Sequence, residues 1–252
     1  MRLITLIFIL LFNSIISQEE KYLLSTVAFY NVENLFDAND DPKNYWDQKW
    51  LEEGTWTEEI YQQKIVNISK VIPDIGYQYT LSHPTIIGLC EVENRQVLID
   101  LVQSKSMKEF SYSIIHFDSP DERGIDVALL FDRKRFKPIK SKIYPLLLIK
   151  KNGDRDYTRD QLLVEGYLDG EKIYVIVNHW PSNYGGREKA IPKRFETANL
   201  VMDVIKKIQN KDKFADIILI GDFNEDPDEQ NINHLTKIGI ESLMIPMLGQ
   251  PK

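Results

Sequence analysis

The chain alternates short apolar runs with polar turns from residue 23 onward. Several runs are rich in β-branched and aromatic residues, which favour strands. We therefore expect strands at 23–30, 85–92, 112–117, 125–131, 143–149, 161–168, 172–178 and 216–222. Many of these runs are apolar at successive positions, a pattern typical of strands that are covered on both faces.

Three segments carry the periodicity of amphipathic helices and would supply that cover. They span residues 57–72, 94–109 and 193–210. The first begins near a capping box formed by Thr55 and Glu58. The apolar stripe of the first helix is Tyr61, Ile65, Ile68 and Ile72, and that of the third is Phe195, Ala198, Met202 and Ile205. Strands in pairs with helical crossovers indicate an α/β sandwich, which we expect to be one domain.

The N-terminus has the pattern of a secretory signal peptide. Arg2 precedes an apolar run, 3–12, that only Thr5 interrupts, and the chain turns polar at Gln18. The run is shorter than the ~20 apolar residues that span a bilayer. We therefore expect a leader at 1–17 and a mature domain at 18–252 that is secreted or periplasmic. No stable membrane association is expected after the leader is removed.

Composition and charge limit the partners. Of 252 residues, 31 are Lys or Arg and 38 are Asp or Glu, so the net charge is −7. This balance excludes the cationic surface of a tight non-specific nucleic-acid binder. Lysines and arginines are dense at 133–151, either as a solvated face or as a phosphate-facing one. The single cysteine, Cys90, excludes an internal disulfide, and we expect a monomer.

Polar side chains follow four of the expected strands, where they would lie at the rim of a sheet. They are Asn31 and Glu33, then Glu91, then Asn178 and His179, and finally Asp222 and Asn224. One polar residue after a strand is usually part of a turn. Four such endings in one chain favour a functional site.

These residue types suit metal-assisted hydrolysis of a phosphodiester. Glu33 and Glu91 offer the oxygen ligands that Mg²⁺ prefers. Asp222 could align the attacking water or accept its proton, and the asparagines could donate hydrogen bonds to the water or the phosphate. His179 could donate to a phosphoryl oxygen or protonate the leaving group. The spacing alone leaves the assignment of these roles open.

Five blocks of sequence, in this order and at these distances, resemble the endonuclease/exonuclease/phosphatase superfamily, the family of pancreatic deoxyribonuclease. They are FYNVENLFD, GLCEVEN, RGIDVALLFD, VNHWPSNYGG and GDFNEDPDE. The resemblance covers about residues 25–250. It implies a four-layer αββα sandwich and Mg²⁺-dependent cleavage of phosphoester bonds, with Mn²⁺ or Ca²⁺ as alternative ions.

The resemblance also implies roles for single residues. Asn31 and Glu33 would belong to the first active-site loop, and Glu91 would be the principal metal ligand, with Glu33 as a second. His179 would contact the scissile phosphate, while Asp222 and Asn224 would position the water and the transition state. The expected substrate-binding residues are Arg123, Asp126, Arg159 and Asn178.

The chain departs from the family pattern near its end. Members carry a Ser-Asp-His block on a late strand, and this sequence has no Asp-His pair. Its only histidine after His179 is His234, in an expected helix. Losing a general acid or base costs typically ~10²–10⁴ in rate. We therefore expect a C-terminally incomplete fold, either a fragment of a longer reading frame or a naturally shortened protein with impaired activity.

The first functional hypothesis is a secreted Mg²⁺-dependent phosphodiesterase, a nuclease with extracellular DNA or RNA as substrate. A second is a phosphatase or phospholipase C-type hydrolase of phosphorylated small molecules or lipids. The sequence gives no evident exposed hydrophobic hairpin for lipid contact, which disfavours the lipid option. A third, of another class, is a non-catalytic phosphate-binding protein, because the late histidine is absent.

Overall fold

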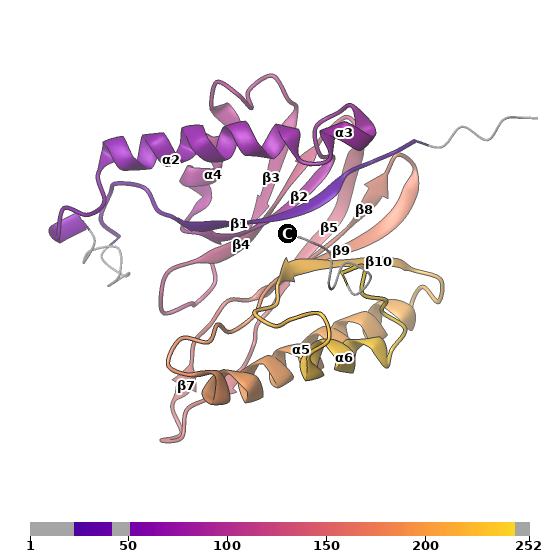
Figure 1. Ribbon diagram of the computed structural model, residues 1–252. Helices are drawn as coiled ribbons and strands as arrows, with labels where there is room; N and C mark the ends of the chain where they lie inside the picture. Colours follow the sequence, from indigo (N-terminus) through magenta and orange to yellow (C-terminus); the bar gives the residue numbers. More distant parts are fainter. Residues whose placement is uncertain (1–22, 42–50, 245–252) are drawn as a thin grey trace, which may run out of the picture.

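The apolar runs form two four-stranded sheets that pack face to face, with helices on both outer faces (Figure 1). The structure, a computed structural model, describes residues 23–41 and 51–244. The expected leader, 1–17, and the last residues, 245–252, lie outside these ranges. The αββα layering expected from the family resemblance is confirmed, since α2 and α4 cover one sheet and α5 and α6 the other.

The first sheet has the order β1-β2-β4-β3. Its strands are β1 (Val27–Leu35), β2 (Ile86–Val92), β3 (Tyr112–His116) and β4 (Asp126–Asp132). β1 and β2 are parallel, and the other pairs are antiparallel. The helical segments of this half are α2 (Glu58–Val71), η1 (Ile72–Asp74), α3 (Tyr77–Thr80) and α4 (Arg95–Gln103).

The second sheet repeats this arrangement with the order β10-β9-β8-β5. Its strands are β5 (Phe136–Tyr144), β8 (Gln161–Leu168), β9 (Glu171–His179) and β10 (Asp216–Asp222), and its helices are α5 (Arg187–Gln209) and α6 (Gln230–Thr236). β9 and β10 are parallel. Within the described residues β1 and β10 are edge strands, and the apolar residues of β10 are only partly buried.

Three apolar cores separate the four layers, and alternate residues of one strand enter different cores. Leu89 of β2 packs towards α2 and α4, whereas its neighbour Cys90 packs between the sheets. On β9, Val175 and Val177 face the inner core, and Ile176 faces α5. This double burial explains why the runs are apolar at successive positions.

Two glycines allow the sheets and strands to approach closely. A Cβ on Gly88 would lie 2.8 Å from the Cδ1 atom of Ile220, on the other sheet. A Cβ on Gly221 would overlap the carbonyl oxygen of Asn178 on β9. The first neighbour is the end of a flexible side chain, whereas the second is backbone and cannot rotate away.

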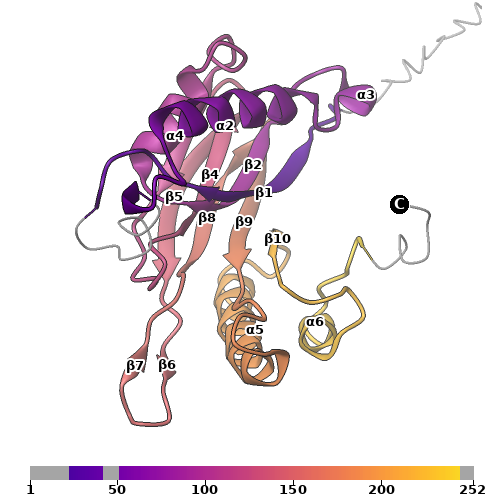
Figure 2. The ribbon, with the colours of Figure 1, turned by 60° about the vertical axis from the view of Figure 1, so that its left-hand side comes forward.

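One strand was predicted at the wrong position. A strand was expected at 143–149, but β5 runs from Phe136 to Tyr144, and the following residues form the hairpin of β6 (Leu148–Ile149) and β7 (Arg155–Asp156). β5 is an edge strand with exposed lysines, so its apolar pattern is weak. The long hairpin projects beyond the sheets, as Figure 2 shows.

The helix boundaries also differ from the expected ones. α2 begins after Thr57, whose hydroxyl accepts from the backbone amide of Ile60, so Thr55 is not the cap. α5 begins six residues before the expected start at 193 and continues through Pro192. Phe195, expected in the buried stripe of α5, is 37% exposed. The four expected core residues of the first helix are buried.

The sequence indicated no exposed hydrophobic hairpin, and this expectation is wrong. Leu147 and Ile149 are 69% and 68% exposed on the β6–β7 hairpin. The hairpin joins β5 to β8 at the edge where β9 ends, since Leu162 pairs with Val177. An exposed apolar hairpin is therefore present near the carboxyl end of β9. Separately, none of the described helices is long and apolar enough to cross a membrane.

We expect Gly221→Ala to destabilise the fold more than Gly88→Ala. The new methyl group at 221 would force β10 away from β9, and overpacking of this kind costs about 1–3 kcal/mol of unfolding free energy. At Gly88 the side chain of Ile220 can rotate instead. Urea unfolding of both variants measures the difference. An equal or smaller loss for Gly221→Ala would contradict the close β9–β10 contact.

Candidate active site

Side chains from both sheets converge where the two parallel strand pairs end. Asn31 pairs with Cys90 across β1 and β2, and Asp222 pairs with His179 across β10 and β9. Asn31 Nδ2 donates to Asp222 Oδ2 at 3.0 Å, which links the two sheets. The same nitrogen lies 3.4 Å from Glu91 Oε1. One amide therefore contacts carboxylates from both sheets.

Glu91 reaches this cluster through a β-bulge. The β2–β4 register shifts between Cys90, which faces the inner core, and Val92, which faces the helices. Glu91 is the extra residue, and its φ of 62° is in the left-handed region that side chains rarely adopt. The bulge aims the carboxylate at the sheet edge, where Glu91 Oε1 lies 3.7 Å from His179 Nε2.

Other left-handed residues lie in the same loops. Glu33 and Asn34 have φ values of 54° and 61° at the register shift in β1, and Asn224 has a φ of 52° after β10. Non-glycine residues in this region are strained by about 1–3 kcal/mol and persist where their surroundings fix them. The concentration of such residues at these strand ends is typical of a functional site.

The surroundings of His179 favour its neutral form. Its side chain is 1% exposed. Burial lowers the pKa of His179 well below its usual value, and the charges of Arg159 and Arg123 lower it further. A neutral ring can donate one hydrogen bond and accept another, but it is a poor proton donor to a leaving group. Among the described residues, no hydrogen-bond partner reaches His179 Nδ1.

Asp222 is oriented through both of its oxygens. Oδ2 accepts from Asn31, and Oδ1 accepts from the backbone amide of Asn224 at 2.9 Å. The side chain of Asn224 is itself occupied, because Nδ2 donates to the carbonyl oxygen of Trp180 at 3.0 Å. Asn224 therefore shapes the turn after β10 and holds Asp222 through its backbone.

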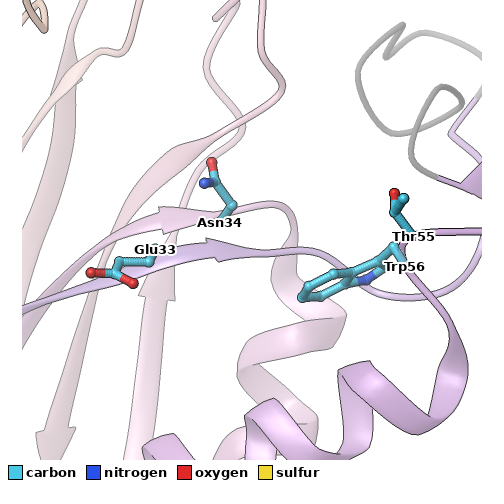
Figure 3. Close-up of a pocket in the computed structure, with 4 residues that line it drawn as sticks. All are labelled: Glu33, Asn34, Thr55 and Trp56. Atoms are coloured by element: carbon cyan, nitrogen blue, oxygen red, sulfur yellow. The ribbon is translucent and has the colours of Figure 1, made fainter. Parts of the chain in front are cut away.

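A pocket of about 240 Å³ lies beside the cluster, lined by Glu33, Asn34, Thr55 and Trp56 (Figure 3). Arg123 connects this pocket to the carboxylates, since its guanidinium donates to Asn34 Oδ1 and lies 3.9 Å from Glu91 Oε2. Arg123 is thus close enough to the cluster to contact an anion there.

Two residues expected to bind substrate are occupied elsewhere. Arg159 is buried, pairs with Asp121 Oδ1 at 3.0 Å and donates to the carbonyl oxygen of Trp180 at 2.9 Å. Asn178 donates to the carbonyl oxygens of Ile176 and Ile220 and accepts from the indole of Trp180. Both side chains position the strand ends instead of facing a substrate.

Asp126 and Glu33 also lie outside the central cluster. Asp126 is buried, with one oxygen 2.9 Å from His116 Nε2 and the other accepting from the amide and hydroxyl of Ser119. The pair anchors the loop that carries Arg123. Glu33, expected as a second metal ligand, is exposed at the pocket. In the described part of the chain, neither Glu33 nor Glu91 belongs to a group of three potential ligand residues whose donor atoms all lie within 4.8 Å of one another.

A buried ion pair lies behind the site and was not predicted from the sequence. Arg194 of α5 is fully buried, and its Nε lies 2.8 Å from Glu225 Oε1. Arg194 Nη1 donates to the carbonyl oxygen of Pro181 and to Asn183 Oδ1. The pair ties the loops after β9 and β10 to α5. The sequence feature that could have indicated this pair is Arg194 itself, which lies four residues after Ala190 and four before Ala198, on the apolar stripe of the helix.

The oxygen donors of the cluster fit a hard divalent cation. Glu91 and Asp222 supply carboxylates, which are ligands that Mg²⁺ prefers. The amide oxygen of Asn31 accepts from the backbone amide of Glu33 at 2.8 Å, and its Nδ2 faces the two carboxylates. Cys90, His179 and Asp222 each place one potential ligand atom within 4.8 Å of the others, a spacing that could hold a metal ion. Burial, followed by the charges of Asp222 and Glu91, raises the pKa of the Cys90 thiol, so a thiolate ligand is disfavoured.

Comparisons with known proteins identify the class. A profile of the endonuclease/exonuclease/phosphatase family matches residues 26–242, so the chain belongs to this family. It is therefore a phosphoesterase-family protein, of a family whose enzymes generally use divalent metal ions. The superfamily resemblance seen in the sequence is confirmed. A search of the curated proteins finds no match.

Solved structures share the fold at low sequence identity. An endonuclease/exonuclease/phosphatase family protein from Bacteroides thetaiotaomicron is 19% identical, with a TM-score of 0.54, over 85% of this chain and 67% of that one. The mannosyl-6-phosphatase Bt3783 of the same species is 19% identical, with a TM-score of 0.54, over 86% and 71%. TDP2 from C. elegans is 21% identical, with a TM-score of 0.50, over 68% and 45%.

We expect Asp160→Asn to stabilise the protein at neutral pH. Burial raises the pKa of Asp160 to about 6, and no partner among the described residues reaches Asp160 Oδ1. Because the folded pKa is above the unfolded one, stability falls as the pH rises from about 4 to 6. The asparagine variant should lose this dependence, so its unfolding midpoint should exceed that of the wild type at pH 7.5 but not at pH 4.

The exposed Asp203 on α5 provides the matched control, since Asp203→Asn removes the same charge without changing a buried group. Chemical unfolding at both pH values gives the comparison. If Asp160→Asn and Asp203→Asn change the unfolding midpoint equally at pH 7.5, Asp160 is not the source of the pH dependence of stability.

Proposed function

We propose that this protein is an exported, Mg²⁺-dependent phosphodiesterase that cleaves DNA or RNA. The convergence of Glu91 and Asp222 on the amide of Asn31, beside a neutral His179, carries the proposal. Each carboxylate is favoured by hydrogen bonds or by a nearby cation. The export follows from the leader expected at 1–17.

The residues of the cluster would have different roles in the reaction. Glu91 would hold the ion, which when bound supplies Lewis-acid stabilisation of phosphoryl charge. Asp222, fixed through both oxygens, would orient the attacking water and accept its proton. His179 would donate a hydrogen bond to a phosphoryl oxygen, because its lowered pKa disfavours proton transfer to a leaving group.

The pocket beside the cluster supports a nucleotide-containing substrate. Trp56 lines it, and base stacking on an aromatic ring contributes about 1–3 kcal/mol. Arg123 donates to Asn34, which also lines the pocket, and lies 3.9 Å from Glu91 Oε2, so it would contact the backbone phosphate. Within the basic run at 133–151, Arg135 pairs with Asp169 and Lys150 with Glu122, so these two residues give no such support.

We expect Glu91→Gln and Asp222→Asn each to lower Mg²⁺-dependent hydrolysis of DNA by at least about 10²-fold, because each removes a carboxylate that no neighbour replaces. Gel assays on single-stranded and duplex oligonucleotides, with Mg²⁺ and with EDTA, measure the loss. The nuclease should release fragments that end in 5′-phosphate.

Asp216→Asn is the matched control, because Asp216 is exposed at the other end of β10. It should keep wild-type activity, and all three variants should keep the wild-type melting temperature. Activity that survives both site variants would overturn the site. Wild-type protein that binds Mg²⁺ and DNA without turnover would favour the non-catalytic alternative, and release of inorganic phosphate would favour a phosphatase, the activity named for the Bacteroides relative.

A lipid head group is a second candidate substrate, favoured by the β6–β7 hairpin. Leu147 and Ile149 are exposed there, next to Lys150 and Lys151, and the hairpin leaves the sheet at the edge where β9 ends. Apolar residues flanked by lysines suit a membrane surface. On this reading the hairpin would rest on the bilayer while a phosphodiester head group enters the site.

The double substitution Leu147→Ser with Ile149→Ser separates the two candidates. If the substrate is a lipid, vesicle binding and release of a phosphorylated head group should fall at least about tenfold, because two apolar anchors are lost. Hydrolysis of a soluble phosphodiester should not change. Leu24→Ser, at another exposed leucine, is the control. Unchanged vesicle binding would exclude the lipid role of the hairpin.

A further inference from the structure

A second pocket, of about 300 Å³, opens on the outer face of the second sheet, beside the C-terminal end of α5. β5, β8 and β9 form its floor, and the residues at the end of α5 form its wall. Its charged lining is Lys140, Lys142, Lys172, Lys207 and Lys211, with Glu165 and Asp212. Five ammonium groups therefore meet two carboxylates in one concave surface, on a chain whose net charge is −7.

Both carboxylates form ion pairs with the same lysine, Lys172. Lys172 Nζ lies 3.1 Å from Glu165 and 3.5 Å from Asp212, and it donates to the hydroxyl of Tyr174 at 2.7 Å. The other four lysines form no ion pair with any carboxylate in the described part of the chain. Lys142 Nζ lies 4.6 Å from the centroid of the Tyr144 ring, which also lines the pocket. No carboxylate of the described residues therefore neutralises these four charges.

Secondary structure explains only part of this arrangement. Lysines at the end of a helix are favoured by its dipole, which accounts for Lys207. Lysines on an edge strand discourage pairing with other sheets, which accounts for Lys140 or Lys142 taken alone. Neither reason accounts for four further lysines gathered around one pocket, because like charges repel each other and both carboxylates of the pocket are paired with Lys172.

We propose that this pocket binds a small oligophosphate, with at least two linked phosphate groups, at a site separate from the active site. Lysine ammonium groups bind phosphate as point charges, without a fixed bidentate geometry, and several can share one anion. The volume is at the small end of the range for ligand pockets, about 300–1,000 Å³. Lys172 precedes His179 by seven residues on β9, about 23 Å along the strand.

Calorimetric titration with inorganic tripolyphosphate, in metal-free buffer at low salt, tests the proposal. The wild type should bind one tripolyphosphate per chain, more tightly than orthophosphate, and more weakly as NaCl is added. Lys140→Gln with Lys142→Gln should weaken binding at least about fivefold, because it removes two of the four unpaired charges. Lys207→Gln with Lys211→Gln should do the same from the other wall.

The matched control is Lys105→Gln with Lys108→Gln, which removes two exposed lysines after α4. It should change the affinity less than twofold. An equal loss in the control, or several weak sites per chain, would overturn the proposal in favour of non-specific attraction. Binding of a short oligodeoxynucleotide but not of tripolyphosphate would also overturn it. The site variants of Glu91 and Asp222 should bind tripolyphosphate like the wild type, which separates this site from the active site.

Discussion

The shared amide of Asn31 is the contact on which the site depends. It lies between Glu91 of the first sheet and Asp222 of the second, and so holds two carboxylates at one edge of the sandwich. Each carboxylate is favoured by hydrogen bonds or by a cation. The site is therefore built as a place for positive charge, in agreement with a family whose enzymes use divalent metals.

Rigid surroundings hold the strained backbone of this edge. The bulge at Glu91 and the left-handed turn at Asn224 persist because neighbouring side chains fix both strand ends. Arg159 with Asp121 braces one side, and Arg194 with Glu225 braces the other. These buried ion pairs do not contact the cluster directly. They fix the loops that do.

The sequence predicted the layers well and the side-chain directions poorly. Strands buried on both faces, such as β2 and β9, are long apolar runs and are easily located, whereas β5 is interrupted by exposed lysines. Asn178 and Arg159 have the residue types of phosphate ligands, yet both are used to position the backbone. Only the three-dimensional packing separates these two uses. The bulge that aims Glu91 left no mark in the hydrophobic pattern.

Glu91 and its neighbours are expected to form a divalent-cation site. Electron paramagnetic resonance of Mn²⁺ can test this expectation without a substrate, because free and bound Mn²⁺ give distinct signals. We expect one bound Mn²⁺ per chain in the wild type and in Asp216→Asn, with affinity at least about tenfold weaker in Glu91→Gln. Equal Mn²⁺ affinity in Glu91→Gln and the wild type would contradict it.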